Sequence, residues 1–143
     1  SKSRSLAGLR IGYALGSETL IATLEAVKNS YNSYTMDALA LAAGEASVRD
    51  EDYFRQRCAR VIATRERAAG ALREVGFTVL PSLTNFLFVT HLKKEAPIIF
   101  ECLRQKNIFI RYFKLPRIDN YLRITVGTDE QMDKLIAALK EFL

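Results

Sequence analysis

A long stripe of apolar residues at helical spacing is the feature of this sequence that most limits its fold. The stripe runs from near Asp50 to Val75, and its members are Phe54, Cys58, Val61, Ile62, Ala68, Ala69, Leu72 and Val75. A helix of this kind buries its apolar side against another layer of structure. Gly76 follows the stripe directly, as expected for a residue in the left-handed conformation that ends a helix. The sequence therefore predicts one long helix with one buried side.

After Gly76 the apolar period shortens to that of strands. Four short segments have this pattern, at residues 77–80, 85–90, 108–113 and 121–126. Pro97 suits the first turn of a helix ending near Gln105, and Thr128 with Gln131 forms a capping box that opens a last helix. The order helix, strand, strand, helix, strand, strand, helix predicts an α+β fold, with a small, mainly antiparallel sheet and helices packed on one face.

The first 48 residues do not fit this α+β unit. Residues 9–15 are short, apolar and bounded by glycines, which predicts a strand, and Ser17 is placed to cap a helix after it. An Ala-rich helix is expected at residues 36–48. We interpret residues 1–34 as the remnant of a larger domain, and residues 35–143 as a connecting helix plus the small domain. The chain also lacks an initiator Met, so we expect it to be part of a longer protein.

Charge and cysteine content argue against several classes of function. Lys and Arg number 21 against 16 Asp and Glu, which gives a formal charge of +5. These charges are dispersed and no apolar run approaches the roughly 20 residues of a membrane span, so neither nucleic acid nor a membrane is the expected partner. Cys58 and Cys102 belong to no CxxC pair and neither is near His91 in sequence. We expect reduced thiols, no metal site and a cytoplasmic protein.

Four basic residues are candidates for chemistry. Arg111 and Arg123 stand inside apolar strand segments, where a guanidinium is costly unless an anion satisfies it. Near the start, Lys2 carries an amine that can condense with an aldehyde, and Arg10 is a cation that can hold a phosphate tail of the same molecule. The alternatives are strand-edge arginines that point to water and an ordinary surface lysine and arginine.

Longer runs around these residues resemble a known family. Residues 1–13 (SKSRSLAGLRIGY) are similar to the lysine motif of the fold-type I aminotransferases that use pyridoxal 5'-phosphate (PLP). Residues 121–128 (YLRITVGT) look most like the histidinol-phosphate aminotransferase subfamily, and residues 85–89 (NFLFV) and 110–113 (IRYF) fit the same family. The resemblance covers essentially the whole chain and implies the small C-terminal domain of a fold-type I enzyme.

The resemblance also implies a role for each candidate residue. Lys2 matches the lysine that binds the cofactor covalently and moves a proton at the substrate α-carbon. Arg10 matches the arginine that binds the cofactor phosphate, and Ser1 adds a hydroxyl to that phosphate. Arg123 matches the arginine that grips the substrate carboxylate, and Arg111 is expected to complete a shared arginine clamp.

The implied reaction is amino-group transfer in histidine biosynthesis. Glutamate leaves its amine on the cofactor as 2-oxoglutarate departs, and imidazole-acetol phosphate then collects the amine and becomes histidinol phosphate. The family is dimeric, so a homodimer is expected of the longer enzyme. The family's other cofactor contacts precede the lysine, which predicts that these 143 residues alone are inactive. Another class I/II aminotransferase, a threonine-phosphate decarboxylase and a non-catalytic α+β binding module are the alternatives.

Overall fold

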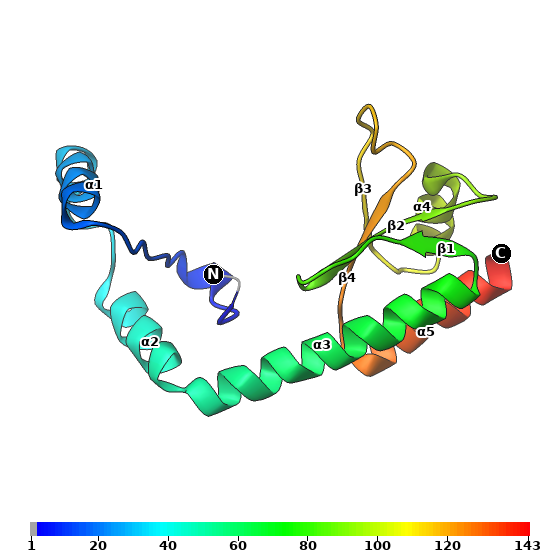
Figure 1. The fold of residues 1–143 in the computed structure, drawn as a ribbon, viewed down its shortest axis with the longest axis horizontal. Helices are drawn as coiled ribbons and strands as arrows, with labels where there is room; N and C mark the ends of the chain where they lie inside the picture. Colours follow the sequence, from blue (N-terminus) through cyan, green and yellow to red (C-terminus); the bar gives the residue numbers. More distant parts are fainter. Residues whose placement is uncertain (1–2) are drawn as a thin grey trace. The chain divides into compact units, whose positions relative to one another are not determined.

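The computed structural model describes residues 3–143, which divide between Gln56 and Arg57 into two units. Helix α3 (Glu51–Glu74) is the long helix that the apolar stripe predicts, and it begins in the first unit and continues into the second. The two units are described separately below, and Figure 1 labels their elements.

A four-stranded antiparallel sheet forms the centre of the second unit. Its strands are β1 (Phe77–Val79), β2 (Phe86–His91), β3 (Arg111–Tyr112) and β4 (Leu122–Thr125), in the spatial order β1-β2-β4-β3. The predicted α+β fold with a mainly antiparallel sheet is confirmed. The third strand is shorter than residues 108–113. At its start, the Ile108 N–H bonds to the Leu103 carbonyl at the end of a helix instead of joining the sheet.

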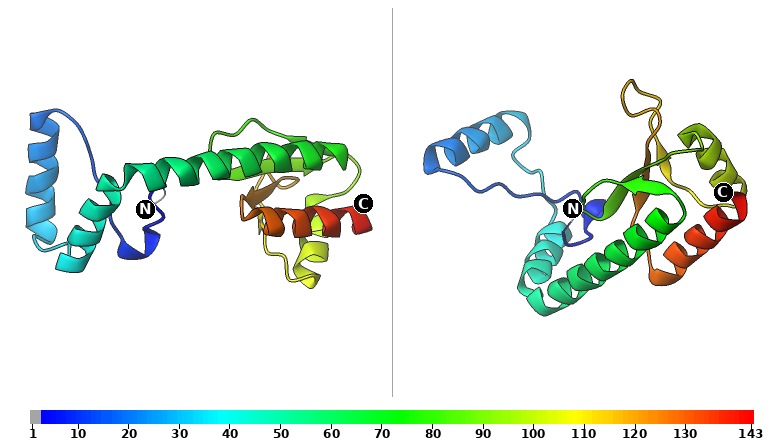
Figure 2. Two further views of the ribbon diagram at one scale, coloured as in Figure 1. Left: turned by 90° about the horizontal axis from the view of Figure 1, so that it is seen from below. Right: turned by 45° about the vertical axis from the view of Figure 1, so that its right-hand side comes forward.

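Three helices cover one face of this sheet, as predicted. They are the C-terminal half of α3, α4 (Ala96–Gln105) and α5 (Asp129–Phe142), and Figure 2 shows α3 and α5 running alongside each other. Every second strand residue points toward them: Leu87, Val89, Leu122 and Ile124 are all nearly fully buried in one core with Leu72, Ile99, Leu103, Met132 and Leu139. Burying each such side chain contributes about 1.5–3 kcal/mol.

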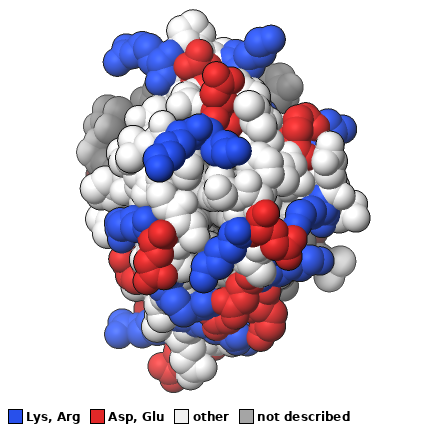
Figure 3. All heavy atoms as spheres, turned by 90° about the vertical axis from the view of Figure 1, so that its right-hand side faces the viewer, with Lys and Arg blue, Asp and Glu red and all other residues white. Residues whose placement is uncertain are grey.

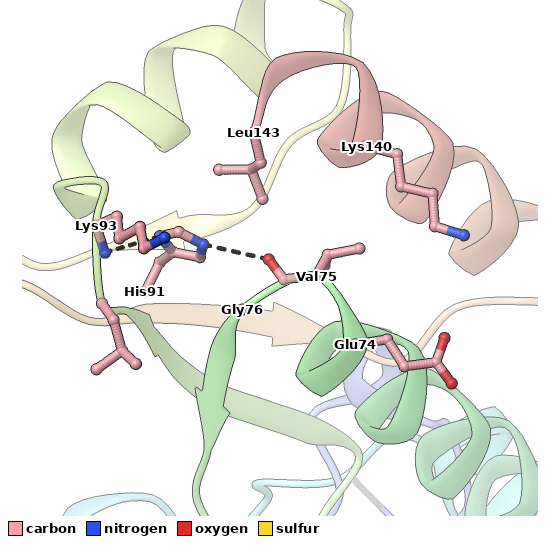
Figure 4. Close-up of a pocket in the computed structure, with 8 residues that line it drawn as sticks. Glu74, Val75, Gly76, His91, Lys93, Lys140 and Leu143 are labelled. Carbon is pink, nitrogen blue, oxygen red and sulfur yellow. Dashed lines mark hydrogen bonds between the residues drawn. The ribbon is translucent and has the colours of Figure 1, made fainter.

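Both predicted helix-end signals in this unit are confirmed. Gly76 has φ +93°, and a Cβ atom there would lie 2.7 Å from His91 Nε2, so only glycine fits. Figure 4 shows the His91 ring beside it: Nδ1 accepts the Lys93 N–H at 3.2 Å, and Nε2 donates to the Val75 carbonyl at 3.2 Å. At the other end of the unit, Thr128 and Gln131 form the full capping box of α5.

The first unit is built from helices and extended chain. It contains a 3₁₀ turn (Ala7–Leu9), α1 (Glu18–Tyr31), capped by the Ser17 hydroxyl as predicted, and α2 (Ala38–Arg49). The strand predicted at residues 9–15 is wrong, since residues 11–17 have no regular structure. A strand requires a neighbouring strand to pair with, and the described part of this unit offers none.

Most apolar side chains of this first unit are exposed. Helix α1 buries no residue and α2 buries only Ala40. Large apolar side chains on these helices remain open to solvent, namely Leu20, Leu24, Val27, Tyr31, Leu39, Leu41 and Val48. Exposed apolar surface of this extent is typical of faces that pack against other protein surface.

Charge is well mixed on the face drawn in Figure 3, where basic and acidic side chains lie among one another. Among the residues that the structure describes, no helix combines the length and apolarity needed to cross a bilayer.

Polar contacts join α3 to the start of α5. The Asp129 carboxylate accepts hydrogen bonds from the Thr64 hydroxyl at 2.9 Å and from Arg67 Nη2 at 3.0 Å. These contacts, the Thr64 hydroxyl first, hold the pKa of Asp129 below its ordinary value of 3.8. Arg67 also forms an ion pair with Asp133 one turn further along α5.

Replacing Asp129 with Asn should therefore make the free energy of unfolding depend less on pH in the acid range. A carboxylate with a lowered pKa stabilises the fold fully above its ordinary pKa and loses that contribution as pH falls through the folded value. The urea midpoint of the wild type should drop as pH falls below about 4, and that of Asp129→Asn should drop less. Asp52→Asn, which removes an exposed carboxylate without an ion pair among the described residues, is the control. If the urea midpoint changes equally with pH in wild type and Asp129→Asn, the Asp129 carboxylate does not stabilise the fold in this way.

Candidate functional site

The face of the sheet opposite the helices carries the candidate site. Because side chains alternate along a strand, Leu122 and Ile124 enter the core while Arg123 between them points to the other face. The strand register places Phe88 on one side of Arg123 and Arg111 on the other. We call this surface the open face. The two arginines predicted from the sequence are thus neighbours on it.

Aromatic rings lie next to both guanidinium groups. Arg123 Cζ is 5.2 Å from the centre of the Phe86 ring and 5.6 Å from that of Phe113. Arg111 Cζ is 5.3 Å from the same Phe113 ring. Each such cation–π contact contributes about 0.5–1 kcal/mol at an exposed site, which orients the groups without neutralising them.

The charge on this face is uncompensated. Within residues 3–143, neither Arg111 nor Arg123 forms an ion pair, and Arg123 Nε is buried without a hydrogen-bond partner. A buried polar atom left without a partner costs about 1–3 kcal/mol. Two adjacent guanidiniums with spare donors are suited to a carboxylate or phosphate, which they can bind through paired hydrogen bonds. The open face is therefore a candidate anion site.

Sequence reasoning did not identify Phe86 and Phe113 as parts of this site. Phe86 follows the loop after β1, and its parity along β2 matches Phe88 rather than the buried Leu87. Alternation along the strand was the available signal. Alternation alone does not identify this contact, because Phe86 and Arg123 lie on different strands and the pairing of those strands must be known first.

The other predicted site residues belong to the first unit. Ser1 and Lys2 lie outside the described residues. Arg10 is exposed, has the left-handed φ of 57°, and donates from Nη1 to the Ala7 carbonyl at 2.9 Å. This hydrogen bond folds the side chain back onto its own turn. The other guanidinium N–H groups form no hydrogen bond within the described residues and can bind an anion.

Arg4 is a residue of this segment that the sequence did not single out. Arg4 Nη2 pairs with Glu51 Oε2 at 2.8 Å, Nη1 donates to the Asp50 carbonyl at 3.3 Å, and the guanidinium lies 3.8 Å from the Phe54 ring centre. The hydrogen bond from Arg4, followed by that from Arg55, lowers the pKa of Glu51 from its ordinary value. These contacts attach residues next to Lys2 in the sequence to the first turn of α3.

Comparison with known proteins agrees with this description. Residues 1–139 match the family described as aminotransferase class I and II. The histidinol-phosphate aminotransferase of Acinetobacter baylyi is 54% identical over 143 residues, which are 100% of this chain and 40% of that protein. That of Acinetobacter baumannii (strain SDF) is 53% identical over 141 residues, or 99% of this chain and 39% of the relative.

A solved structure shows the same arrangement of elements. It is histidinol-phosphate aminotransferase from Sinorhizobium meliloti in complex with pyridoxal-5'-phosphate, with a TM-score of 0.85, 30% identity, and coverage of 100% of this chain and 40% of that one. The present fold is thus that of the C-terminal part of PLP aminotransferase structures. The chain belongs to the class I and II aminotransferase family. It spans about 40% of the length of the curated relatives it matches.

Removing the Arg4 side chain should loosen the segment that follows Lys2. In Arg4→Met, the amide protons of Leu9 and Arg10 are expected to exchange with solvent about fivefold faster, because the charged contacts that anchor their turn are lost. Hydrogen exchange followed by mass spectrometry measures this. The matched control is Arg49→Met, which breaks an exposed ion pair with Glu45 on α2. Unchanged exchange at Leu9 and Arg10 in Arg4→Met would show that Arg4 anchors nothing.

Proposed function

We propose that this chain works within a longer enzyme that transfers an amino group between glutamate and histidinol phosphate. The observation that carries the proposal is the pair of unpaired guanidiniums, Arg111 and Arg123, on the open face. Relatives that carry the name histidinol-phosphate aminotransferase, at 53% and 54% identity, support this choice of substrates.

The two substrates share the chemistry that such a clamp binds. Glutamate and 2-oxoglutarate present carboxylates, whereas histidinol phosphate and imidazole-acetol phosphate present a phosphate in place of an α-carboxylate. One pair of planar donor groups can bind either anion. We assign Arg123 to the direct bidentate contact, because its Nε lacks a partner, and Arg111 to the second charge. The clamp accepts each substrate in turn, as a ping-pong reaction requires.

The residues of the first unit fit the proposed cofactor, PLP. Arg10 keeps several N–H donors available, and a Cβ atom at the nearby Gly8 would meet no described atom within 4 Å, so the turn is open to a phosphate. We propose that Arg10 and the Ser1 hydroxyl hold this phosphate and that Lys2 holds the aldehyde end. When bound, PLP withdraws electrons from the substrate α-carbon. Lys2 then moves the proton at that carbon.

The exposed apolar side chains of α1 and α2 support the proposal of a larger assembly. We propose that residues 1–34 belong to a larger domain, that residues 35–143 form the connecting helix and small domain, and that the preceding part of the longer enzyme covers α1 and α2. A homodimer is the proposed state of that enzyme. These 143 residues alone are then inactive. A cytoplasmic location, consistent with free Cys58 and Cys102, is proposed as well.

Three alternative functions predict different products, substrates or cofactor binding. A threonine-phosphate decarboxylase would release carbon dioxide, and an aromatic aminotransferase would accept phenylpyruvate. A non-catalytic α+β module would bind no PLP at all.

The lysine assignment is tested on the intact enzyme loaded with PLP. Borohydride should fix the cofactor to Lys2, identified by peptide mass spectrometry, and turnover of glutamate with imidazole-acetol phosphate should exceed that with phenylpyruvate by at least about 100-fold. Lys2→Ala should lose both the fixed label and the turnover. A label on another lysine would overturn the assignment of Lys2. A preference for phenylpyruvate would overturn the proposed substrate.

The clamp is tested by charge removal. Arg123→Gln should lower kcat/KM for glutamate and for histidinol phosphate by about 100-fold each, as expected when one partner of a buried charged hydrogen bond is lost. Arg111→Gln should act in the same direction by about tenfold. The control is Arg117→Gln, on the exposed loop between β3 and β4. Normal kinetics in Arg123→Gln would exclude the clamp.

A further inference from the structure

A buried arginine in the middle of α3 is not used by the proposed reaction. Arg65 is 5% exposed, although arginine is rarely buried without partners. Its Nε and Nη2 donate to Glu66 Oε1 at 3.1 and 2.9 Å, and its Nη1 donates to the Thr84 carbonyl at 3.0 Å. The last contact crosses from the helix to the loop between β1 and β2.

Three hydrogen bonds join that loop to the backbone of Phe86. The Ser82 hydroxyl donates to the Phe86 carbonyl at 2.6 Å, the Thr84 hydroxyl lies 3.2 Å from the same carbonyl, and the Phe86 N–H donates to the Thr84 hydroxyl at 3.3 Å. Beyond it, the Asn85 carbonyl accepts the Val126 N–H at 2.9 Å. A shift of Thr84 is therefore transmitted directly to Phe86.

Phe86 in turn contacts the candidate anion site. Its ring centre lies 5.2 Å from Arg123 Cζ, and residue 86 is paired with Thr125 on the same strand as Arg123. The ring forms one wall beside a guanidinium whose Nε has no other partner among the described residues. A continuous set of contacts thus leads from Arg65 through Thr84 and Phe86 to Arg123.

We propose that Arg65 is a positioning residue for the anion clamp: it fixes the loop that holds the Phe86 ring against Arg123. The proposal rests on the proposed function only in its choice of anions. Arg65 touches no substrate in this scheme. Its effect falls on the affinity for anionic substrates, while the bound cofactor and the chemical step are unaffected.

The experiment compares Arg65→Met, Arg65→Lys and Arg67→Met in the intact holoenzyme. Arg65→Met should raise KM for glutamate and for histidinol phosphate about tenfold while kcat changes less than about twofold. Arg65→Lys should recover most of the loss, because its ammonium can still donate to the Thr84 carbonyl. Arg67→Met should leave KM unchanged, since Arg67 lies on the same helix but pairs with Asp129 and Asp133.

A double-mutant cycle distinguishes positioning from a general loss of stability. In an Arg123→Gln background, Arg65→Met should raise KM no further, because the group that it positions is absent. An additive tenfold increase, or a fall in kcat together with a changed absorbance spectrum of the bound cofactor, would refute the proposal.

A binding measurement separates this proposal from the proposed reaction. Titration with inorganic phosphate, followed by the NMR signal of the Arg123 Nε–H group, should give about tenfold weaker binding in Arg65→Met than in wild type. If the wild type binds phosphate with this difference but transaminates neither substrate, the proposed function fails and the role of Arg65 stands. If the wild type is active and phosphate binding is equal in both proteins, the role of Arg65 fails alone.

Discussion

Alternation along β4 is the constraint on which the rest of the second unit depends. Leu122 and Ile124 are nearly fully buried and fix one side of the strand against the helices. Arg123 lies between them, and its side chain therefore points to the opposite face of the sheet. A register shift by one residue would bring a guanidinium into the core and expose two large aliphatic side chains, so core packing and arginine placement are enforced together.

The same constraint explains why the open face carries free charge. Antiparallel pairing sets Arg111 directly opposite Arg123, and like charges at such positions destabilise a sheet. Cation–π contacts with Phe86 and Phe113 orient the two groups but supply no negative charge. A bound anion would offset this electrostatic cost, because it would supply the negative charge that the described residues around the two guanidiniums lack.

The first unit shows a different balance. Its helices are capped and regular, yet α1 buries no residue. Its best-defined contacts are polar, with Arg4 joined to Glu51 and stacked on Phe54. Hydrogen bonds and caps suffice to form local structure, but apolar burial supplies most of the stability of a domain. This chain spans about 40% of the length of the curated relatives that it matches.

Local interactions are what the sequence determined by itself. Helix periodicity, the glycine at φ +93° after α3 and the Thr128 capping box all involve residues within a few positions of one another, and each was predictable from spacing. Motif resemblance likewise indicated the family and pointed to Arg111 and Arg123. Only the tertiary structure decided that these arginines are neighbours and that Phe86 and Phe113 flank them. It also decided that Arg4 contacts the first turn of α3 and that Arg65 contacts the loop between β1 and β2. Residues 9–15 show the reason most clearly: an apolar run has strand propensity by itself, but a strand exists only where another strand is present to pair with it.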